Sequence, residues 1–199
     1  MLCLVTDRRR LTPEAPFDVA RRRLLDQARW AAASRVDLIQ VRERDLEAAP
    51  LAALVTDLLL VCAGSGTRVV VNDRLDVALA CGAQGVHLRH DSVPAGRVRS
   101  IVPPGFLIGR SVHSAAEAAQ AGPVDYLIAG TVYPTPSKPT IPTIGLRGLA
   151  EIVQAATVPV LAIGGLTADG LDAVAATGAA GVAGIGLFID WFDTHEAAS

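Results

Sequence analysis

The sequence has few aromatic residues and little net charge, and both shortages narrow what the chain can be. Aromatic side chains make up 4% of its 199 residues, whereas 51% of the residues are hydrophobic and eighteen are glycine. These values predict an aliphatic core crossed by tight turns. The net charge is -2, and no long basic or acidic run occurs. The composition therefore gives no indication of binding to nucleic acid or to a membrane.

The chain also has few cysteines, and it lacks an apolar run long enough to cross a membrane. Cys3, Cys62 and Cys81 show no metal-ligand spacing and stand among apolar neighbours, which is typical of buried free thiols in a reducing compartment. The charge-free run 173–189 contains four glycines and falls short of a membrane span. The apolar run at the start of the sequence is interrupted early by Asp7, so it lacks the apolar core of a signal peptide. We therefore expect a cytoplasmic protein.

Short apolar, β-branched runs alternate with longer amphipathic runs along the whole chain. This alternation is typical of a parallel sheet covered by helices on both faces. Eight such units favour a single closed (β/α)8 TIM barrel with a parallel eight-stranded core over an open doubly wound sheet. No linker-like stretch interrupts the pattern, so residues 1–199 are predicted to form one domain. The expected strands are 2–6, 36–41, 68–72, 85–88, 107–111, 126–130, 158–163 and 181–186, and the expected helices are 15–33, 47–63, 74–81, 93–101, 114–121, 146–156, 167–177 and 188–197.

Polar residues gather where the expected strands end, which is where the chemistry of such barrels is found. Gln40, Arg42 and Arg44 alternate, so they share one side of the second strand as it leaves the core. The third, fourth and fifth strands are followed or ended by Asn72 and Asp73, by Asp91, and by Ser111. Surface decoration would scatter such groups over both ends of the barrel. Their concentration at one end predicts a functional rim.

The sixth strand opens into Gly130-Thr-Val-Tyr-Pro-Thr-Pro-Ser-Lys138, a loop suited to holding an anion. Thr135 and Ser137 can donate hydroxyl hydrogen bonds, and Lys138 supplies a point charge that suits phosphate. The bland alternative is a proline-rich surface turn with an incidental lysine. Glycine pairs near the ends of the seventh and eighth strands predict a phosphate cradle of backbone amides, formed by Gly164, Gly165, Gly184 and Gly186.

These motifs resemble the thiamine-phosphate synthase and thiazole tautomerase superfamily over almost the whole chain. The resemblance rests on Val5-Thr-Asp7, Ile39-Gln-Val-Arg-Glu-Arg44, Val71-Asn-Asp73, Gly85-Val-His-Leu88, Ile108-Gly-Arg-Ser-Val-His-Ser114, Tyr133-Pro-Thr-Pro-Ser-Lys138 and Ala162-Ile-Gly-Gly165. It implies a transferase of the thiamine-phosphate diphosphorylase type, which acts in thiamine biosynthesis. Such an enzyme joins hydroxymethylpyrimidine diphosphate to thiazole phosphate and releases pyrophosphate. That reaction needs stabilisation of the departing diphosphate and shielding of a cationic carbon from water.

The resemblance also implies roles for the matched residues. Gln40 would orient the pyrimidine, and the diphosphate would contact Arg42, Arg44 and Asn72. The leaving group would be assisted by Ser111 and Lys138, so the expected catalytic residues are Arg42, Ser111 and Lys138. The thiazole phosphate would be held by Thr135, Ser137 and the backbones of Gly165, Gly184 and Gly186. Mg²⁺ would bind Asp73, and Asp91 is the expected second carboxylate.

Three positions depart from the superfamily's patterns and keep alternatives open. The synthase usually has lysine where Arg44 stands. It usually has its second metal-binding carboxylate where Ser92 stands. Arg89 could supply positive charge in place of a metal or be an exposed loop arginine. The tautomerase branch has its catalytic histidine where this chain has Thr131. The alternatives are a thiazole phosphate tautomerase-like protein and a non-catalytic regulator that binds thiazole or thiamine phosphate. A homo-oligomer is left open. His87 is interpreted as a packed core histidine, and for His113 a packing role is favoured over contact with a ligand.

Overall fold

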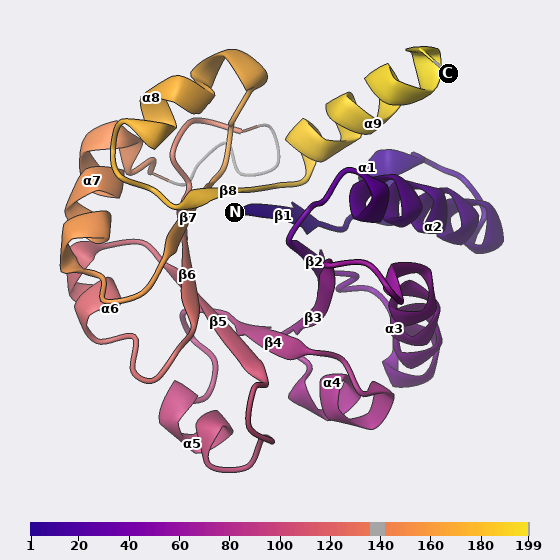
Figure 1. The fold of residues 1–199 in the computed structure, drawn as a ribbon, viewed down its shortest axis with the longest axis horizontal. Helices are drawn as coiled ribbons and strands as arrows, with labels where there is room; N and C mark the ends of the chain where they lie inside the picture. Colours follow the sequence, from indigo (N-terminus) through magenta and orange to yellow (C-terminus); the bar gives the residue numbers. More distant parts are fainter. Residues whose placement is uncertain (136–141, 199) are drawn as a thin grey trace. The chain divides into compact units, whose positions relative to one another are not determined.

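A computed structural model describes residues 1–135 and 142–198 of the chain (Figure 1). Within these residues, strands β1 to β8 hydrogen-bond in chain order and form a closed barrel, so the predicted (β/α)8 fold is confirmed. The chain divides into two compact units. The β1–β3 unit comprises Leu2–Val86 and the C-terminal segment from Ile185, and the β5–β8 unit comprises Met1 and His87–Gly184. The expectation of a single domain stays a prediction.

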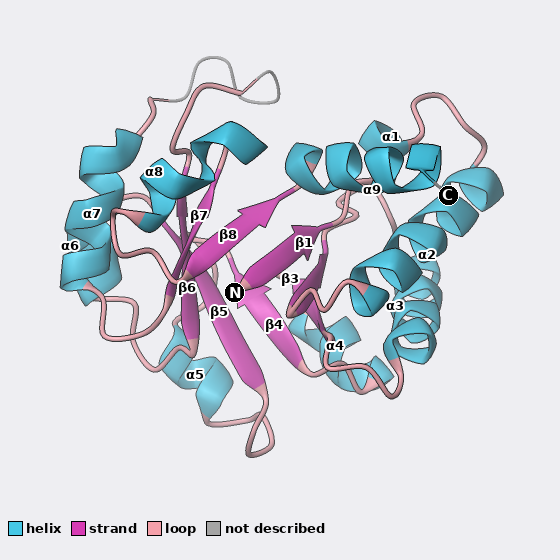
Figure 2. Ribbon diagram, turned by 45° about the horizontal axis from the view of Figure 1, so that its top comes forward, coloured by secondary structure: helices cyan, strands magenta, loops and turns pink. Residues whose placement is uncertain are grey.

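The β1–β3 unit alternates buried strands with outer helices. Strands β1 and β2 are parallel, with Val5 opposite Gln40, and β2 and β3 are parallel, with Gln40 opposite Val70. Every residue of β2 is buried, as expected for a strand covered on both faces. Helices α2 and α3 lie side by side (Figure 2). Its elements are β1 (Leu2–Val5), α1 (Arg8–Leu11), α2 (Phe17–Ala33), β2 (Leu38–Val41), α3 (Ala48–Cys62), β3 (Arg68–Asn72), α4 (Leu75–Cys81), the start of β4 (Gly85–Leu88) and α9 (Gly186–Ala198).

The β5–β8 unit repeats the same alternation with shorter helices. Strands β5, β6, β7 and β8 pair in parallel, with Ser111 opposite Ile128 and Gly130 opposite Ile163. Helices α6 and α7 pack against each other (Figure 2). Its elements are the end of β4, α5 (Ala95–Arg99), β5 (Leu107–Val112), α6 (Ala115–Ala119), β6 (Tyr126–Gly130), α7 (Gly145–Ala155), β7 (Val160–Ile163), the 3-10 turn η1 (Ala168–Gly170), α8 (Leu171–Ala175) and β8 (Gly181–Gly184).

Several details differ from the sequence prediction. Helix α1 was not expected; it begins after Asp7, whose side chain accepts a hydrogen bond from the Arg10 backbone N–H at 3.1 Å and so caps the first turn. The expected helix 167–177 is instead split into η1 and α8. Gly186 begins α9 rather than ending the eighth strand. Cys3 and Cys62 are buried free thiols as predicted, whereas Cys81 is half-exposed. Among the described helices, none has the length and apolar character that crossing a membrane requires.

Candidate active site

In the β1–β3 unit, the loop after β2 is fixed by a buried ion pair. Nη1 of Arg8 lies 2.7 Å from Oε2 of Glu43, and the backbone N–H of Arg8 donates to Oε1 of the same carboxylate at 3.1 Å. Arg8 also donates to Asp45, and this hydrogen bond lowers the pKa of Asp45 to about 2. Burial raises the pKa of Glu43, and the hydrogen bond from Arg8 opposes that shift. The start of α1 is therefore tied to the loop that carries the two predicted arginines.

Arg42 and Arg44 flank this buried glutamate in the sequence, and they belong to a cationic cluster. Arg42 is half-buried, and its backbone N–H donates to Oγ1 of Thr6 at 2.9 Å. Burial lowers the pKa of Arg42, and repulsion from Arg44 and, more weakly, from Arg10 lowers it further against the attraction of Asp7 and Glu43. An arginine held partly out of water beside two other guanidinium groups favours a negatively charged ligand.

Gly186 stands at the first position of α9, next to Arg10 of the same unit. A Cβ atom added at Gly186 would lie 3.1 Å from Nη2 of Arg10. The predicted phosphate contact at Gly186 therefore involves a helix start with an arginine beside it, where backbone N–H groups and positive charge coincide.

Gln40 presents an incomplete hydrogen-bond set at the end of β2. Its Nε2 donates to Oδ1 of Asn72 on the neighbouring strand at 3.0 Å, which fixes the orientation of the amide. The side chain is buried, with 3% of the residue exposed. Nothing among the described residues donates to its Oε1, although this atom is itself buried. A buried acceptor without a donor is costly, so this oxygen is suited to receive a hydrogen bond from a ligand.

Asp73 follows Asn72 in a strained backbone conformation. Its φ angle is +60°, and the backbone N–H of Arg74 donates to the carbonyl oxygen of Asn72 at 2.8 Å across it. Residues other than glycine seldom adopt this left-handed region, although aspartate and asparagine do so more often than most. Such strain concentrates at functional sites. The turn holds the Asp73 carboxyl group at the carboxyl end of β3.

In the β5–β8 unit, Ser111 is joined to two buried side chains on neighbouring strands. Oγ of Ser111 lies 2.9 Å from Nε2 of His87, and Nδ1 of His87 lies 3.3 Å from the hydroxyl oxygen of Tyr126. His87 is thus a packed core histidine, as the sequence suggested, but it also contacts a predicted catalytic residue. Its position directly before the end of β4 is evident from the sequence, whereas the contact itself could not be read from spacing.

The loop after β6 is seated on the glycine pair after β7. The backbone N–H of Tyr133 donates to the carbonyl oxygen of Gly164 at 3.0 Å. Gly165 has a φ of +64°, and a Cβ atom there would lie 2.6 Å from the carbonyl oxygen of Pro134. These glycines therefore give the loop room to approach, which adds a packing role to the predicted phosphate cradle. Thr135 is half-exposed in this loop; the predicted residues Ser137 and Lys138 lie outside the described residues.

The predicted metal carboxylate Asp91 is engaged by a neighbour. It forms an ion pair with Arg89, whose backbone N–H donates a hydrogen bond to Oγ of Ser92 at 2.9 Å. Arg89 thus neutralises Asp91 within its own turn. The described residues contain no group of three or more histidine, cysteine, aspartate or glutamate side chains arranged to hold a metal ion.

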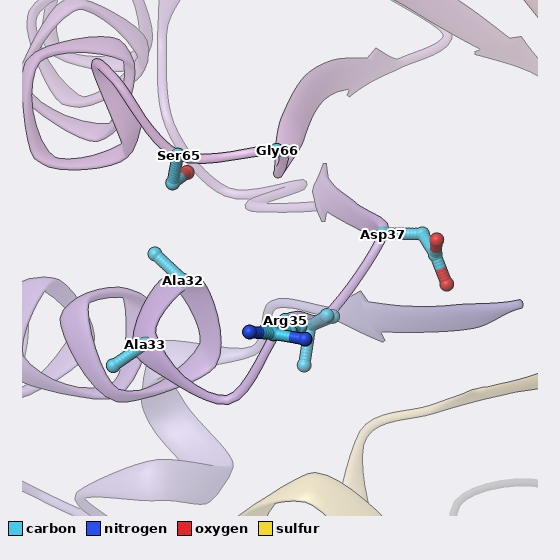
Figure 3. Close-up of a pocket in the computed structure, with 7 residues that line it drawn as sticks. Ala32, Ala33, Arg35, Asp37, Ser65 and Gly66 are labelled. Atoms are coloured by element: carbon cyan, nitrogen blue, oxygen red, sulfur yellow. The ribbon is translucent and has the colours of Figure 1, made fainter.

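Two other features lie apart from the predicted chemistry. His113 contacts the carbonyl oxygen of Gly130 through Nδ1, so its ring is held against the end of β6. A surface pocket of about 470 Å³ lies where the chain enters β2 and β3, the amino ends of these strands (Figure 3). Oδ2 of Asp37 in its lining accepts from the backbone N–H of Leu2 at 2.7 Å and has a structural use. The predicted residues Gln40 and Asn72 stand at the opposite, carboxyl ends of those two strands.

Fold and strand ends together define the class: a (β/α)8 barrel protein with a cationic cluster after its second strand. Known proteins make the assignment narrower. The sequence model of the thiamine monophosphate synthase family matches residues 2–188, and the chain belongs to this family.

Individual relatives agree with the family. A thiamine-phosphate synthase of Methanoculleus marisnigri is 44% identical over 115 residues, which are 57% of this chain and 54% of that protein. A thiamine-phosphate synthase of Gloeobacter violaceus is 42% identical over 58% of this chain and 34% of that protein. The matched part thus spans about half the length of these relatives or less.

Solved structures support the same fold. The thiamine phosphate pyrophosphorylase from Pyrococcus furiosus is 35% identical, with a TM-score of 0.77 over 92% of this chain and 84% of that chain. A 3-hexulose-6-phosphate synthase has a TM-score of 0.65 at 17% identity over 92% of this chain and 90% of that chain, a likeness of fold alone.

Proposed function

We propose that the protein is a thiamine-phosphate synthase that joins hydroxymethylpyrimidine diphosphate to thiazole phosphate and releases pyrophosphate. Family membership supports this activity, and the observation that carries it is the buried Oε1 of Gln40, to which no described residue donates. The pyrimidine bears an exocyclic amino group, which is a hydrogen-bond donor of the kind this oxygen needs. Because Asn72 holds the other end of the amide, the acceptor is already oriented before the ligand arrives.

The arginines suit the departing diphosphate. Charge builds up on the leaving oxygens as the bond to the pyrimidine carbon breaks, and fixed guanidinium groups stabilise that charge. Arg42 is half-buried and already repelled by Arg44 and Arg10, so an anion would relieve this repulsion. In the proposal, Arg42, Arg44 and Asn72 bind the diphosphate, and Ser111 and Lys138 donate hydrogen bonds to it as it leaves.

A magnesium ion fits the donor set in part. Mg²⁺ is commonly held by one or two carboxylates, with phosphate oxygens and water completing its shell. Asp73 offers one carboxylate at the end of β3, whereas Asp91 is paired with Arg89 and would have to leave that pair to act as the second. When bound, the ion would neutralise part of the negative charge of the diphosphate. Asp73 and Asp91 are the proposed metal ligands.

The thiazole phosphate is assigned to the loops after β6, β7 and β8. Thr135, Ser137, Gly165, Gly184 and Gly186 are its proposed contacts, through hydroxyl groups and backbone amides. The tautomerase-like alternative finds less support. Thr131, which stands where that branch has a catalytic histidine, is buried, and its hydroxyl cannot exchange protons near neutral pH as imidazole does.

The proposal includes the protein's surroundings. Its partners are the two small phosphorylated substrates, without nucleic acid or membrane, and assembly into a homo-oligomer is compatible with it. The free thiols Cys3, Cys62 and Cys81 favour a cytoplasmic location.

Variants of Gln40 test the proposed pyrimidine contact. Gln40→Leu removes the acceptor and should raise KM for the pyrimidine diphosphate about tenfold or more, since an unmatched polar group in a site of this kind costs about 1–3 kcal/mol. Gln40→Glu keeps the acceptor and should retain more of the affinity. Thr56→Val, on the exposed side of α3, is the control and should leave KM unchanged. Equal KM values for wild type and Gln40→Leu would refute the contact, and tight binding of thiazole phosphate without turnover would select the non-catalytic regulator.

A further inference from the structure

A buried chain of three polar side chains ends at Ser111. Tyr126 on β6, His87 on β4 and Ser111 on β5 follow one another through contacts of 3.3 and 2.9 Å. Only 1% of His87 and 2% of Tyr126 is exposed. The two rings lie 5.6 Å apart between centroids, with an interplanar angle of 33°. The imidazole is thus held on both sides and cannot turn freely.

The backbone of β5 is built to admit this pair. Gly109 lies opposite Tyr126 in the register of β5 and β6. A Cβ atom at position 109 would lie 2.1 Å from Cζ of Tyr126 and 2.6 Å from Nδ1 of His87. Any side chain at this position would displace both rings. The glycine of the Gly-Arg-Ser segment therefore makes room for the chain that ends at the serine two residues later.

The imidazole of His87, in the middle of this row of polar side chains, is neutral. Burial lowers the pKa of His87 to about 3, because a charged ring would lose its hydration. A neutral imidazole has one N–H donor and one acceptor nitrogen. The hydrogen bonds along Tyr126, His87 and Ser111 can therefore be donated in either of two directions. Either Nε2 donates to Ser111 and Nδ1 accepts from Tyr126, or Nε2 accepts from Ser111 and Nδ1 donates to Tyr126.

An anion at Ser111 selects one of these directions. A fully ionised phosphate oxygen only accepts hydrogen bonds, so the hydroxyl of Ser111 must donate to it. The serine oxygen is then left to accept from His87. In the opposite direction, the serine hydrogen is used by Nε2, and the serine lone pairs face the negative charge.

We propose that His87 is a positioning residue that adopts the Nε2–H tautomer when an anion binds, so that Tyr126 donates to Nδ1, Nε2–H donates to Ser111, and Ser111 donates to the anion. The identity of that anion as the departing diphosphate rests on the proposed function; the direction of the chain does not. His87 never exchanges a proton with the substrate in this arrangement. It keeps the serine hydrogen pointed at the ligand.

The direct test is nitrogen NMR of the protein labelled with ¹⁵N in the histidine rings, with and without inorganic pyrophosphate. The sequence has four histidines, and the His87 signals are assigned by their loss in His87→Gln. With pyrophosphate bound, we expect a protonated Nε2 and an unprotonated Nδ1. A protonated Nδ1, a doubly protonated ring, or no binding of pyrophosphate would overturn the proposal.

Binding of pyrophosphate to variants separates positioning from structural support. His87→Leu should weaken binding about tenfold. This is the effect expected when the hydrogen bond from Ser111 to the charged ligand is no longer held in its orientation. His87→Gln, whose amide can donate to Ser111, should lose less. In a Ser111→Ala background, His87→Leu should have no further effect. An equal loss in both backgrounds would show that His87 acts through the fold and not through Ser111.

Neither readout requires turnover. The expected tautomer in a protein that forms no thiamine phosphate would leave the positioning role intact and refute only the proposed enzyme. Turnover combined with the opposite tautomer would refute the positioning role of His87 and leave the proposed enzyme intact.

Discussion

Nη1 of Arg8 lies 2.7 Å from Oε2 of Glu43, and both side chains are buried. The pair joins the first turn of α1 to the loop that carries Arg42 and Arg44. The positive charges of these two arginines repel each other. The buried Glu43 carboxylate, through its ion pair with Arg8, holds this loop in place against that repulsion.

Removal of one partner of this pair should destabilise the protein. Arg8→Met leaves the Glu43 carboxylate buried without its cation, which typically costs about 3–5 kcal/mol. Urea denaturation should show a lower free energy of unfolding. The double variant Arg8→Met with Glu43→Leu should recover part of the loss because no charge is left buried. A single variant as stable as the wild type would contradict the anchoring role.

Asp45 should make stability dependent on pH in the acid range. Its hydrogen bond from Arg8 lowers its pKa from 3.8 to about 2 in the folded protein. A depressed folded pKa contributes stability above the unfolded value, and that contribution is lost as pH falls through the folded value. The free energy of unfolding should therefore drop between about pH 4 and pH 2, and the drop should be smaller in Asp45→Asn. Parallel curves for the two proteins would count against this assignment.

Asp73 should be needed for activity and not for folding. Asparagine tolerates the same left-handed backbone, so Asp73→Asn should keep the free energy of unfolding within about 0.5 kcal/mol. It should abolish magnesium-dependent coupling because it removes the negative charge. Asp73→Leu is the comparison for backbone strain and should cost about 1–3 kcal/mol. Full coupling by Asp73→Asn at ordinary Mg²⁺ concentrations would exclude the proposed metal role.

Gly165 should resist substitution for a steric reason. Gly165→Ala combines a φ of +64° with a contact of 2.6 Å to Pro134, whereas Gly105→Ala has a φ of +80° and open space around it. The control therefore carries the backbone strain without the collision. We expect Gly165→Ala to lose more stability than Gly105→Ala, by about 1–3 kcal/mol, and to bind thiazole phosphate more weakly. Equal losses in calorimetry would show that the loop after β6 does not depend on this close approach.

The sequence predicted the barrel well because its strands are continuous apolar runs bounded by polar residues, a pattern that depends on local order alone. It missed α1, whose four residues are too few for a periodic pattern and whose signal is the capping side chain of Asp7. It also missed the partners of the site. Glu43 reads as a charged surface residue until Arg8 is seen beside it, and His87 reads as core until Ser111 is seen at 2.9 Å. Such contacts join residues far apart in the chain, so spacing carries no trace of them.

Synthase activity can be measured by mixing the purified protein with hydroxymethylpyrimidine diphosphate, thiazole phosphate and Mg²⁺ and quantifying both products. We expect thiamine phosphate and pyrophosphate to appear in equal amounts, with formation of both dependent on the two substrates together. Absence of both products at every Mg²⁺ concentration, in a protein that still binds thiazole phosphate, would show that the protein is not a thiamine-phosphate synthase.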